Sequence, residues 1–486
     1  MRGVYTIINE KCAILEEAVV RYKTVVTELH AIARRSRRYR ARIAGRYTRR
    51  RTDRHKGFIQ ELKLNLTKPC EEYPYYKMDE RYNLTINTTS ELRSDSIWGM
   101  LRGLETVSQL FYISYDYSEV RIGATQIRDA PYYYHRGLLL DTSRHFISVP
   151  NILMTLDAMA MNKMNVFHWH IVDDQSFPYQ SDALPDLSDF GAYFPTMVYT
   201  RSNIKTIIDY ATKRGIRVIP EFDVPGHTSS WGNAYPDLLT QCYDDDLKVV
   251  GLGPMHPLRK ITYDLLEQLF LELRRTFPEK YFHIGGDEVD WACWLSNPEI
   301  REFIVKNKLT SADEVYSIFM QKVIELLGNN TVPIVWQEVY DHGVPLPNNT
   351  LVQIWKYEHV DAMTRALMDN MQILVSADWY LDYLMNNFRA LYESDPRTQV
   401  APRLLDQSLL QNIVGGEACM WSEKVDDRNV ISRVWPRASA VAEVLWSKTN
   451  GSISYSVLHR AEEHACRMIR RGVHAEPPAG PGFCIT

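Results

Sequence analysis

An alternation of short apolar runs with amphipathic helical stretches, which begins at Arg136, is the strongest constraint on the fold of this chain. Near-continuous apolar strands separated by helices pair in parallel, with both faces of the sheet covered. Eight such runs predict an α/β fold, a (β/α)₈ (TIM) barrel. The expected strands are Gly137–Arg144, Asn165–Asp173, Arg217–Val224, Tyr281–Glu288, Val332–Glu338, Leu351–Tyr357, Gln372–Tyr380 and Ile413–Trp421.

Helical spacing of apolar residues supplies the connections between these strands. The linker from Glu338 to Leu351 is short and rich in Pro, Asn and Gly, so helix five of the barrel is expected to be irregular or missing. The expected helices are Ile152–Met161, Asn203–Arg214, Tyr263–Phe277, Val315–Leu327 and Val430–Leu445.

The first part of the chain differs in character, and we expect a small α+β domain over residues 1–130 ahead of the barrel at 131–486. Tyr82–Ile86 alternates like a strand, and Trp98–Leu110 has helical spacing. Arg34–Lys56 holds twelve basic residues. Such a block can bind a polyanion, but a solvated or disordered loop is the more common outcome and is favoured here, and no nucleic-acid partner is expected.

Carboxylates, one arginine and several tryptophans stand at the carboxyl ends of the expected strands, where barrel enzymes carry their chemistry. Acidic and arginine side chains hold sugar hydroxyls, and indole rings cover the apolar faces of sugars. A single tryptophan is more often core packing, but several at successive strand ends favour a sugar pocket. The residues are Arg144, Asp173, Asp174, Asp223, His227, Asp287, Glu288, Trp336, Glu338, Trp355, Trp379, Tyr380, Trp421 and Glu423.

The pair Asp287-Glu288 is the sharpest of these features. It follows Gly285-Gly286, which lets the backbone leave the strand close to a ligand. Neighbouring carboxylates repel each other, so one of them should keep its proton to higher pH, as a general acid requires. A solvated acidic turn is the alternative, which the position at a strand end makes less attractive.

His168 and His170 support a rival interpretation, because period two places both imidazoles on one face of a strand. His227, His283 and Asp287 could complete a zinc or two-metal site of a metallohydrolase. Histidines satisfied within a packed barrel are the simpler account, so no metal is expected.

The compartment is indicated by six N-x-[ST] sequons, at Asn65, Asn83, Asn87, Asn329, Asn348 and Asn450. No apolar run has the length of a bilayer-spanning helix, so no transmembrane segment is expected. The first thirty residues do not have the pattern of a signal peptide, because charged residues interrupt any apolar stretch. We therefore expect a secretory protein whose signal peptide is missing from this sequence.

Several strings resemble the eukaryotic β-N-acetylhexosaminidases of glycoside hydrolase family twenty, and within them the β-subunit type. They are HRGLLLDTSRHF (135–146), NVFHWHIVDD (165–174), EFDVPGHTSSWG (221–232), HIGGDEVDWACW (283–294), IVWQE (334–338) and GGEACMWSE (415–423). The resemblance runs from about Trp98 to Cys484. It implies an exo-acting glycosidase without a cofactor that removes terminal β-linked N-acetylglucosamine and N-acetylgalactosamine from oligosaccharides, glycoproteins or glycolipids.

The family's mechanism is retaining and substrate-assisted, and it assigns roles by resemblance. Glu288 would be the general acid/base, and Asp287 would orient the 2-acetamido group, whose carbonyl oxygen attacks the anomeric carbon to form an oxazolinium intermediate. Tyr380 would donate a hydrogen bond to that carbonyl. The pocket would be walled by Trp336, Trp355, Trp379 and Trp421, and sugar hydroxyls would be held by Arg144, Asp173 and Glu423, with His227 beside the acid.

Asp382 indicates the substrate's charge. Relatives that accept sulfated or sialylated glycans have Asn-Arg here, whereas a carboxylate at Asp382 would repel a 6-sulfate. Neutral glycans are therefore expected.

The resemblance also pairs the cysteines and implies an assembly. It pairs Cys12 with Cys70, Cys242 with Cys293 and Cys466 with Cys484, leaving Cys419 as a buried thiol. It implies a lysosomal or secreted protein that forms a homodimer. Disulfides and sequons agree on an oxidising compartment.

Two other classes of function remain to be tested against the glycosidase, namely a glycan-binding protein that has kept the fold, and the metallohydrolase. Turnover of a chromogenic β-N-acetylglucosaminide with and without a chelator separates the three.

Overall fold

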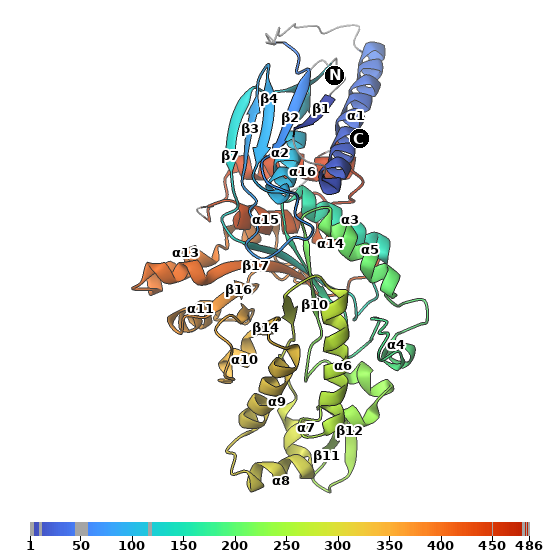
Figure 1. Cartoon of the computed structure of the whole chain (residues 1–486), viewed down its shortest axis with the longest axis vertical. Helices are drawn as coiled ribbons and strands as arrows, with labels where there is room; N and C mark the ends of the chain where they lie inside the picture. The colour runs from blue at the N-terminus through green and yellow to red at the C-terminus, as the bar shows by residue number, and fades with distance from the viewer. Residues whose placement is uncertain are drawn as a thin grey trace.

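Eight parallel strands close into a barrel in this computed structural model, which describes residues 4–8, 12–43, 57–114, 119–449, 451–478, 482 and 484 (Figure 1). The predicted (β/α)₈ barrel is confirmed, although every strand ends before its predicted end, so the candidate site residues lie mostly on the loops that follow. The strands are β8 (His135–Asp141), β9 (Val166–His170), β10 (Arg217–Glu221), β13 (Tyr281–His283), β14 (Val332–Trp336), β15 (Leu351–Ile354), β16 (Gln372–Val375) and β17 (Ile413–Met420).

The helices around the barrel follow the predicted pattern, and helix five is indeed irregular. Only the short α10 (Gln337–Asp341) lies between β14 and β15 among the described elements. The single helix predicted over Val430–Leu445 is wrong, because Pro436, which lacks a backbone N–H, separates α14 (Val430–Val434) from α15 (Arg437–Trp446). The other larger connecting helices are α3 (Val149–Met161), α5 (Arg201–Thr212), α6 (Lys260–Thr276), α9 (Ala312–Leu327) and α11 (His359–Met368).

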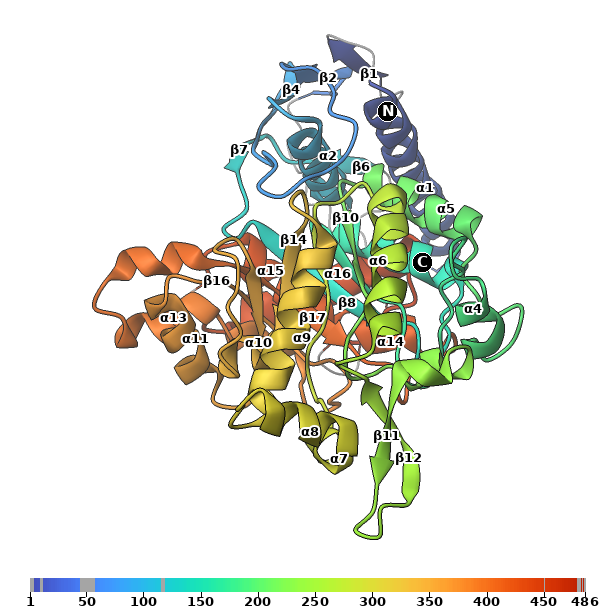
Figure 2. The same ribbon diagram turned by 60° about the horizontal axis from the view of Figure 1, so that its bottom comes forward.

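Further elements lie outside the alternating strands and helices of the barrel. The hairpin β11 (Leu239–Tyr243) and β12 (Val249–Met255) projects from the molecule (Figure 2). The remaining α-helices are α4 (Asp186–Gly191), α7 (Trp291–Ser296), α8 (Pro298–Lys306), α12 (Phe388–Glu393), α13 (Pro396–Val400) and α16 (Tyr455–Arg470). No helix of the described chain combines the length and apolarity needed to cross a membrane.

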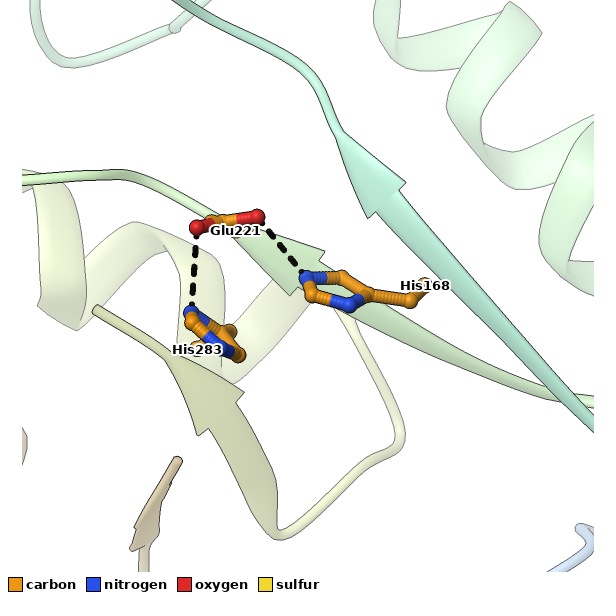
Figure 3. A group of neighbouring side chains, drawn as sticks. All are labelled: His168, Glu221 and His283. Atoms are coloured by element: carbon orange, nitrogen blue, oxygen red, sulfur yellow. Dashed lines mark ion pairs between the residues drawn. The ribbon is translucent and has the colours of Figure 1, made fainter. Parts of the chain in front are cut away.

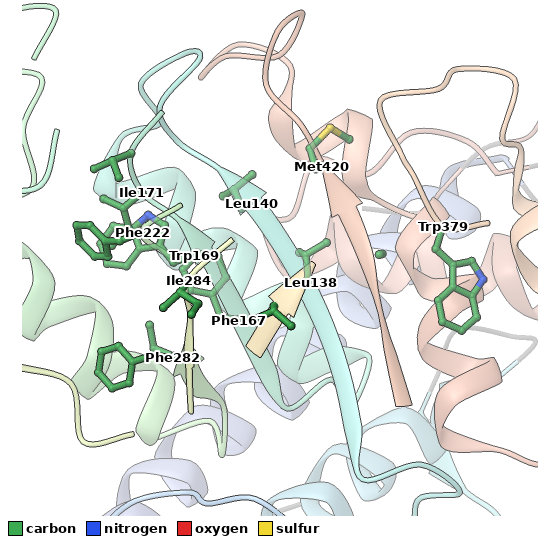
Figure 4. Packing of buried hydrophobic residues seen from close by; sticks show 14 of the residues in the cluster. Leu138, Leu140, Phe167, Trp169, Ile171, Phe222, Phe282, Ile284, Trp379 and Met420 are labelled. Atoms are coloured by element: carbon green, nitrogen blue, oxygen red, sulfur yellow. The ribbon is translucent and has the colours of Figure 1, made fainter. Parts of the chain in front are cut away.

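Every second side chain of each strand points into the barrel lumen, because successive side chains of a strand point to opposite faces. The inward side chains of the strands form layers along the barrel axis. Outward residues such as Leu138, Phe167 and Trp169 pack against the surrounding helices (Figure 4). The lower lumen is apolar and is formed by Val166, Ile219, Ile334, Leu351, Leu374 and Val414. Above it lies a layer of buried polar side chains, which are His168, Glu221, His283 and Glu417. The layer next to the strand ends is aromatic and contains Trp336, Tyr380, Trp355 and Trp421.

The N-terminal part is the expected α+β arrangement. Its five-stranded sheet has the order β1-β2-β4-β3-β7, and α1 and α2 pack beside it (Figure 1). The predicted strand and helix are confirmed as β3 (Tyr82–Ile86) and α2 (Ile97–Leu110). The other elements are β1 (Val4–Ile8), α1 (Ala13–Ile43), β2 (Glu61–Leu66), β4 (Ser90–Ser94), β5 (Phe111–Ile113), β6 (Val120–Ile122) and β7 (Thr125–Asp129).

The loop expected over Arg34–Lys56 needs a correction, because residues 34–43 continue α1. Arginine has a high helix propensity, so a basic run attached to a packed helix extends it. Residues 44–56 lie outside the described residues.

A buried carboxylate joins the two parts of the molecule. Glu80 Oε1 accepts hydrogen bonds from Arg102 of α2 at 2.8 Å and from Arg136 of β8 at 2.5 Å. Arg102 also donates to the carbonyl of Gly215, before β10, at 2.7 Å. The N-terminal sheet is therefore anchored to the barrel by a buried ion network.

The three disulfides expected by resemblance are confirmed, with Cα–Cα distances of 5.6, 4.6 and 5.1 Å. They join Cys12 to Cys70, Cys242 to Cys293 and Cys466 to Cys484. Cys419 is buried and unpaired among the cysteines, as expected.

The sequons differ in accessibility. Asn83, Asn87, Asn329 and Asn348 are exposed, whereas Asn65 is half-buried and donates to Glu91 at 2.9 Å. Asn450 lies outside the described residues. Glycosylation stays a prediction, which the exposed positions suit best.

Candidate active site

Polar and aromatic side chains from most of the barrel's strand ends converge on one pocket. Arg144 contacts Asp173, Asp173 contacts His227, and His227 reaches Asp287 and Glu288. The arginine guanidinium also lies over the Trp421 ring, 5.0 Å from its centroid. Trp336, Trp355 and Tyr380 surround the same space.

The backbone before the acidic pair is shaped by glycine. Gly285 has φ +65°, and a Cβ there would lie 1.6 Å from Asp223 Oδ1. Gly286 donates its N–H to that same Asp223 oxygen at 2.8 Å. The backbone of Gly285 and Gly286 therefore comes close to a side chain of the site, as expected, and that side chain is Asp223.

Asp287 and Glu288 occupy opposite environments. Burial raises the pKa of Asp287, and its Oδ1 has no hydrogen-bond partner among the described groups. The hydrogen bond and charge of His227 lower the pKa of Glu288. The expectation that one member of the pair holds its proton to higher pH fits Asp287, the buried member, whereas the pKa of Glu288, the residue expected as the general acid, is lowered.

Asp223 is a third carboxyl, next to Asp287, and the two affect each other's pKa. It is fully buried, and burial together with the neighbouring Asp287 raises its pKa well above the usual range. A protonated Asp223 donates to a carboxylate without adding a second charge, so Asp287 can ionise beside it.

His227 lies between Asp173 on one side and the acidic pair on the other. Its Nδ1 lies 3.2 Å from Asp173 Oδ1, and its Nε2 lies 3.5 Å from Glu288 Oε2 and 3.7 Å from Asp287 Oδ2. Although burial opposes protonation, the hydrogen bonds to Asp173 and Glu288 raise the pKa of this imidazole. The residue is therefore an imidazolium aimed at the acidic pair.

Arg144 is held as a fixed fork by two buried carboxylates. Its guanidinium nitrogens lie 3.2 Å from Asp141 Oδ2 and 2.9 Å from Asp173 Oδ2. Burial works against the charge, but Asp141 and Asp173 raise the pKa of Arg144 further. The expectation that Asp173 accepts from sugar hydroxyls needs correction, because its side chain is fully buried and is used to hold Arg144 and His227.

The aromatic residues form a stacked wall. Tyr380 is nearly parallel to Trp355, with ring centroids 6.1 Å apart, and lies 6.3 Å from Trp421. Trp336 donates to Glu221 Oε1 at 2.8 Å, and Trp355 donates to Glu338 Oε2 at 2.9 Å. These bonds fix the two indoles, so the wall is rigid before any ligand arrives.

Trp379 does not join this wall, and its assignment to the pocket is wrong. Its indole donates to the carbonyl of Leu391 at 3.1 Å and packs in the outer core (Figure 4). The adjacent Tyr380, not Trp379, packs with the aromatic residues of the lumen.

Two acidic residues lie at the mouth of the pocket. Asp382 is half-buried, and burial raises its pKa to about 6, with Glu423 adding to the rise. Glu423 is exposed, and Tyr383 stacks on Tyr380 with centroids 5.8 Å apart. A cavity of about 200 Å³ on the Glu288 side of the pocket is lined by Gly286, Glu288, Val289, Trp291, Glu338, His342, Trp355 and Lys356.

The histidines of the rival metal interpretation are engaged with carboxylates of the lumen. His168, Glu221 and His283 lie close enough together to hold an ion (Figure 3). However, Glu221 already accepts from Trp336 and His170 and pairs with His168. This arrangement fits the simpler account of histidines satisfied within a packed barrel.

The lumen carboxylates Glu221 and Glu417 were not foreseen as part of this region. Each is a charged residue that ends or interrupts an otherwise apolar run, in RVIPE and GGEACM. Such a residue must find partners inside the barrel, because a buried charge is paired or coordinates a metal. That signal was available, but the partners lie on other strands, far from Glu221 and Glu417 in the sequence.

The geometry defines a barrel glycoside hydrolase, with an acidic pair beside an aromatic wall and a carboxylate-bound arginine. The comparisons with known proteins are more specific. Residues 133–449 match "Glycosyl hydrolase family 20, catalytic domain", and residues 4–110 match "beta-acetyl hexosaminidase like".

Similar proteins cover nearly the whole chain. The β-hexosaminidase subunit β of Homo sapiens is 40% identical over 97% of this chain and 83% of its own length. The subunit α of Rattus norvegicus is 39% identical over 97% of this chain and 88% of its own. The structure of Flavobacterium johnsoniae chitobiase aligns with a TM-score of 0.82 and 30% identity, over 97% of this chain and 70% of that one.

The chain therefore belongs to glycosyl hydrolase family 20. It is an exo-acting β-N-acetylhexosaminidase, with the retaining, substrate-assisted mechanism that is general in this family. The similarity to these subunits and the three disulfides support a lysosomal or secreted location.

Proposed function

We propose that Glu288 is the general acid/base of this enzyme and that Asp287 is the group that orients and stabilises the substrate's 2-acetamido group. The observation that carries the assignment is His227, whose Nε2 lies within 3.7 Å of both carboxylates. Glu288 is the exposed member and can reach the leaving oxygen. Asp287 is buried next to the aromatic wall, where the acetamido group would lie.

The reaction then needs no nucleophile from the protein. The acetamido carbonyl oxygen attacks the anomeric carbon as Glu288 gives its proton to the leaving oxygen, and the glycosidic bond breaks. Ionised Asp287 stabilises the oxazolinium, and Tyr380 donates to the carbonyl oxygen. Glu288 then takes a proton from the attacking water. A held internal nucleophile provides an effective molarity of about 10⁵–10⁸ M, and a positioned acid roughly 10²–10⁴-fold.

The pocket's other residues bind the sugar. Trp336, Trp355 and Trp421 would enclose the acetamido methyl group, and the fork of Arg144 would hold the ring hydroxyls. Glu423 and Asp382 would accept from hydroxyls at the mouth. The carboxyl of Asp382 supports a preference for neutral glycans.

The organisation of the chain is proposed as an N-terminal domain at 1–130 and a catalytic domain at 131–486. Oligosaccharides, glycoproteins or glycolipids would supply the sugars. We also propose a homodimer, on the likeness to subunits of β-hexosaminidases.

A chromogenic β-N-acetylglucosaminide tests the proposal. Turnover at mildly acid pH that survives a chelator is expected, and Asp287→Asn should lose most of it. Turnover abolished by the chelator would favour the metallohydrolase, and binding without turnover would favour a glycan-binding protein.

A further inference from the structure

His170 lies between two carboxylates in the upper lumen. Its Nδ1 is 2.7 Å from Glu221 Oε2, and its Nε2 is 2.7 Å from Asp173 Oδ2. All three side chains are buried. The residue touches no part of the pocket's acidic pair, so the mechanism above leaves it without a role.

Both carboxylates bind donors on their other sides. Asp173 also faces Arg144 at 2.9 Å, His227 at 3.2 Å and the N–H of Asp174 at 2.6 Å. An oxygen that accepts from several donors carries no proton, so Asp173 is ionised.

Glu221 is satisfied in the same way. Its Oε1 accepts from Trp336 Nε1 at 2.8 Å, and its Oε2 lies 2.7 Å from His170 Nδ1. The same Oε2 lies 2.9 Å from His168 Nε2, a pair that Figure 3 shows. With an ionised carboxylate at each ring nitrogen, both nitrogens of His170 must donate. Only the imidazolium form has two donors.

Other titratable groups surround this imidazolium, on its own strand and on neighbouring ones. His168 on the same strand is paired with Glu417 of β17 at 2.7 Å, and His283 of β13 lies 3.1 Å from Glu221. Asp141 of β8 faces Arg144. Burial opposes the charge of His170, but Glu221 and Asp173 raise its pKa to about 10, whereas burial lowers the pKa of His283.

We propose that His170 is a permanent imidazolium and a positioning residue, which through Asp173 holds Arg144 and His227 in place and sets the pH range of the acidic pair. The connection has three contacts, from His170 to Asp173, from Asp173 to His227 and from His227 to Glu288. This inference rests on the proposed role of Glu288 and adds a residue three contacts behind it.

The sign of the effect follows from charge. Replacing the cation by a neutral side chain leaves Asp173 less compensated, so its pKa rises and it releases Arg144 and His227 at a higher pH than before. The added negative potential also makes Glu288 keep its proton to higher pH. Both limbs of the pH profile should therefore move upward.

The first experiment compares His170→Gln with the matched control His283→Gln. His283 is equally buried and touches the same Glu221, but it is neutral, and Gly285 N–H donates to its Nδ1 at 3.1 Å. For kcat/KM on an aryl β-N-acetylglucosaminide, His170→Gln should shift both limbs upward by roughly 1 pH unit. His283→Gln should leave them in place, whatever it does to the rate.

A second measurement uses the wild-type protein and does not depend on turnover. In ¹⁵N-histidine-labelled wild-type protein, both ring nitrogens of His170 should be protonated at pH 8, where an ordinary histidine is neutral. A neutral His170 at pH 8, unmoved limbs in His170→Gln, or equal shifts in both variants would overturn the inference. If the wild-type protein fails to turn over the substrate, the proposed function fails, while the protonation result still decides the state of His170.

Discussion

Asp287 and Glu288 are neighbours in the chain, yet the Asp287 side chain is 10% exposed and the Glu288 side chain is 60% exposed. The same His227 nitrogen lies 3.7 Å from one carboxylate and 3.5 Å from the other. One backbone turn thus carries one buried and one accessible carboxyl. The proposed roles, with Asp287 at the acetamido group and Glu288 at the leaving group, rest on this difference.

Glu288→Gln should show a strong dependence on the leaving group. Substrates with alkyl or sugar leaving groups need protonation and should lose roughly 10²–10⁴-fold in kcat/KM. Aryl glycosides with acidic phenols need little protonation in the first step and should lose less. Steady-state kinetics over a series of phenols measures this, and an equal loss across the series would argue against the acid role.

Asp382 should make the discrimination against 6-sulfated substrates depend on pH. Its pKa is raised to about 6, chiefly by burial, so it is neutral below that value and negative above it. The ratio of kcat/KM for sulfated over neutral substrate should rise as the pH falls through 6. In Asp382→Asn the ratio should be higher and flat, and a ratio that varies in the same way in the variant would exclude Asp382 as the cause.

Asp223→Asn should be tolerated, because burial and the neighbouring Asp287 raise the pKa of Asp223 well above its usual range, and asparagine keeps an acceptor for Gly286 N–H and a donor for Asp287. Activity should stay within about tenfold of wild type, in contrast to roughly 10²–10³-fold losses for Asp287→Asn. A buried carboxyl whose pKa is higher in the folded than in the unfolded state lowers the free energy of unfolding once the pH rises above the unfolded-state pKa. Urea unfolding should therefore show a stability advantage of Asp223→Asn that grows with pH.

Glu80→Ala should strongly destabilise the protein, because it leaves Arg102 and Arg136 buried without their carboxylate. Breaking a buried pair costs about 3–5 kcal/mol. Asp79→Ala is the matched control, since it removes a neighbouring pair whose Arg81 is 73% exposed, where a cost of about 0–1 kcal/mol is usual. Urea unfolding measures both, and similar effects of the two variants would contradict the anchoring role of Glu80.

The sequence predicted the barrel because apolar strand runs and amphipathic helices carry local signals. The predicted strand ends were too late, since polar site residues such as Asp287 directly continue the runs. The direction of side chains in the loops was harder to predict. Trp379 and Tyr380 are adjacent, and only their tertiary contacts decide which of them faces the lumen. The same holds for Asp173, whose burial depends on Arg144 and His227 from other strands.

The polar layer of the lumen was beyond local patterns. Glu221 and Glu417 find their histidine partners on nearby strands of the barrel that are far apart in the sequence, so only strand order and register bring them together. The Pro436 break was visible in the sequence but was overridden by the apolar spacing around it.

The central claim is that the substrate's own acetamido group is the nucleophile. Aryl glycosides with mono-, di- and trifluoroacetamido groups test it most directly, because each fluorine weakens the carbonyl oxygen as a nucleophile while the ring and leaving group stay the same. The account predicts a steep, monotonic fall of kcat/KM with fluorine count. A rate that does not change along the series would mean that another group attacks the anomeric carbon, and would contradict the account.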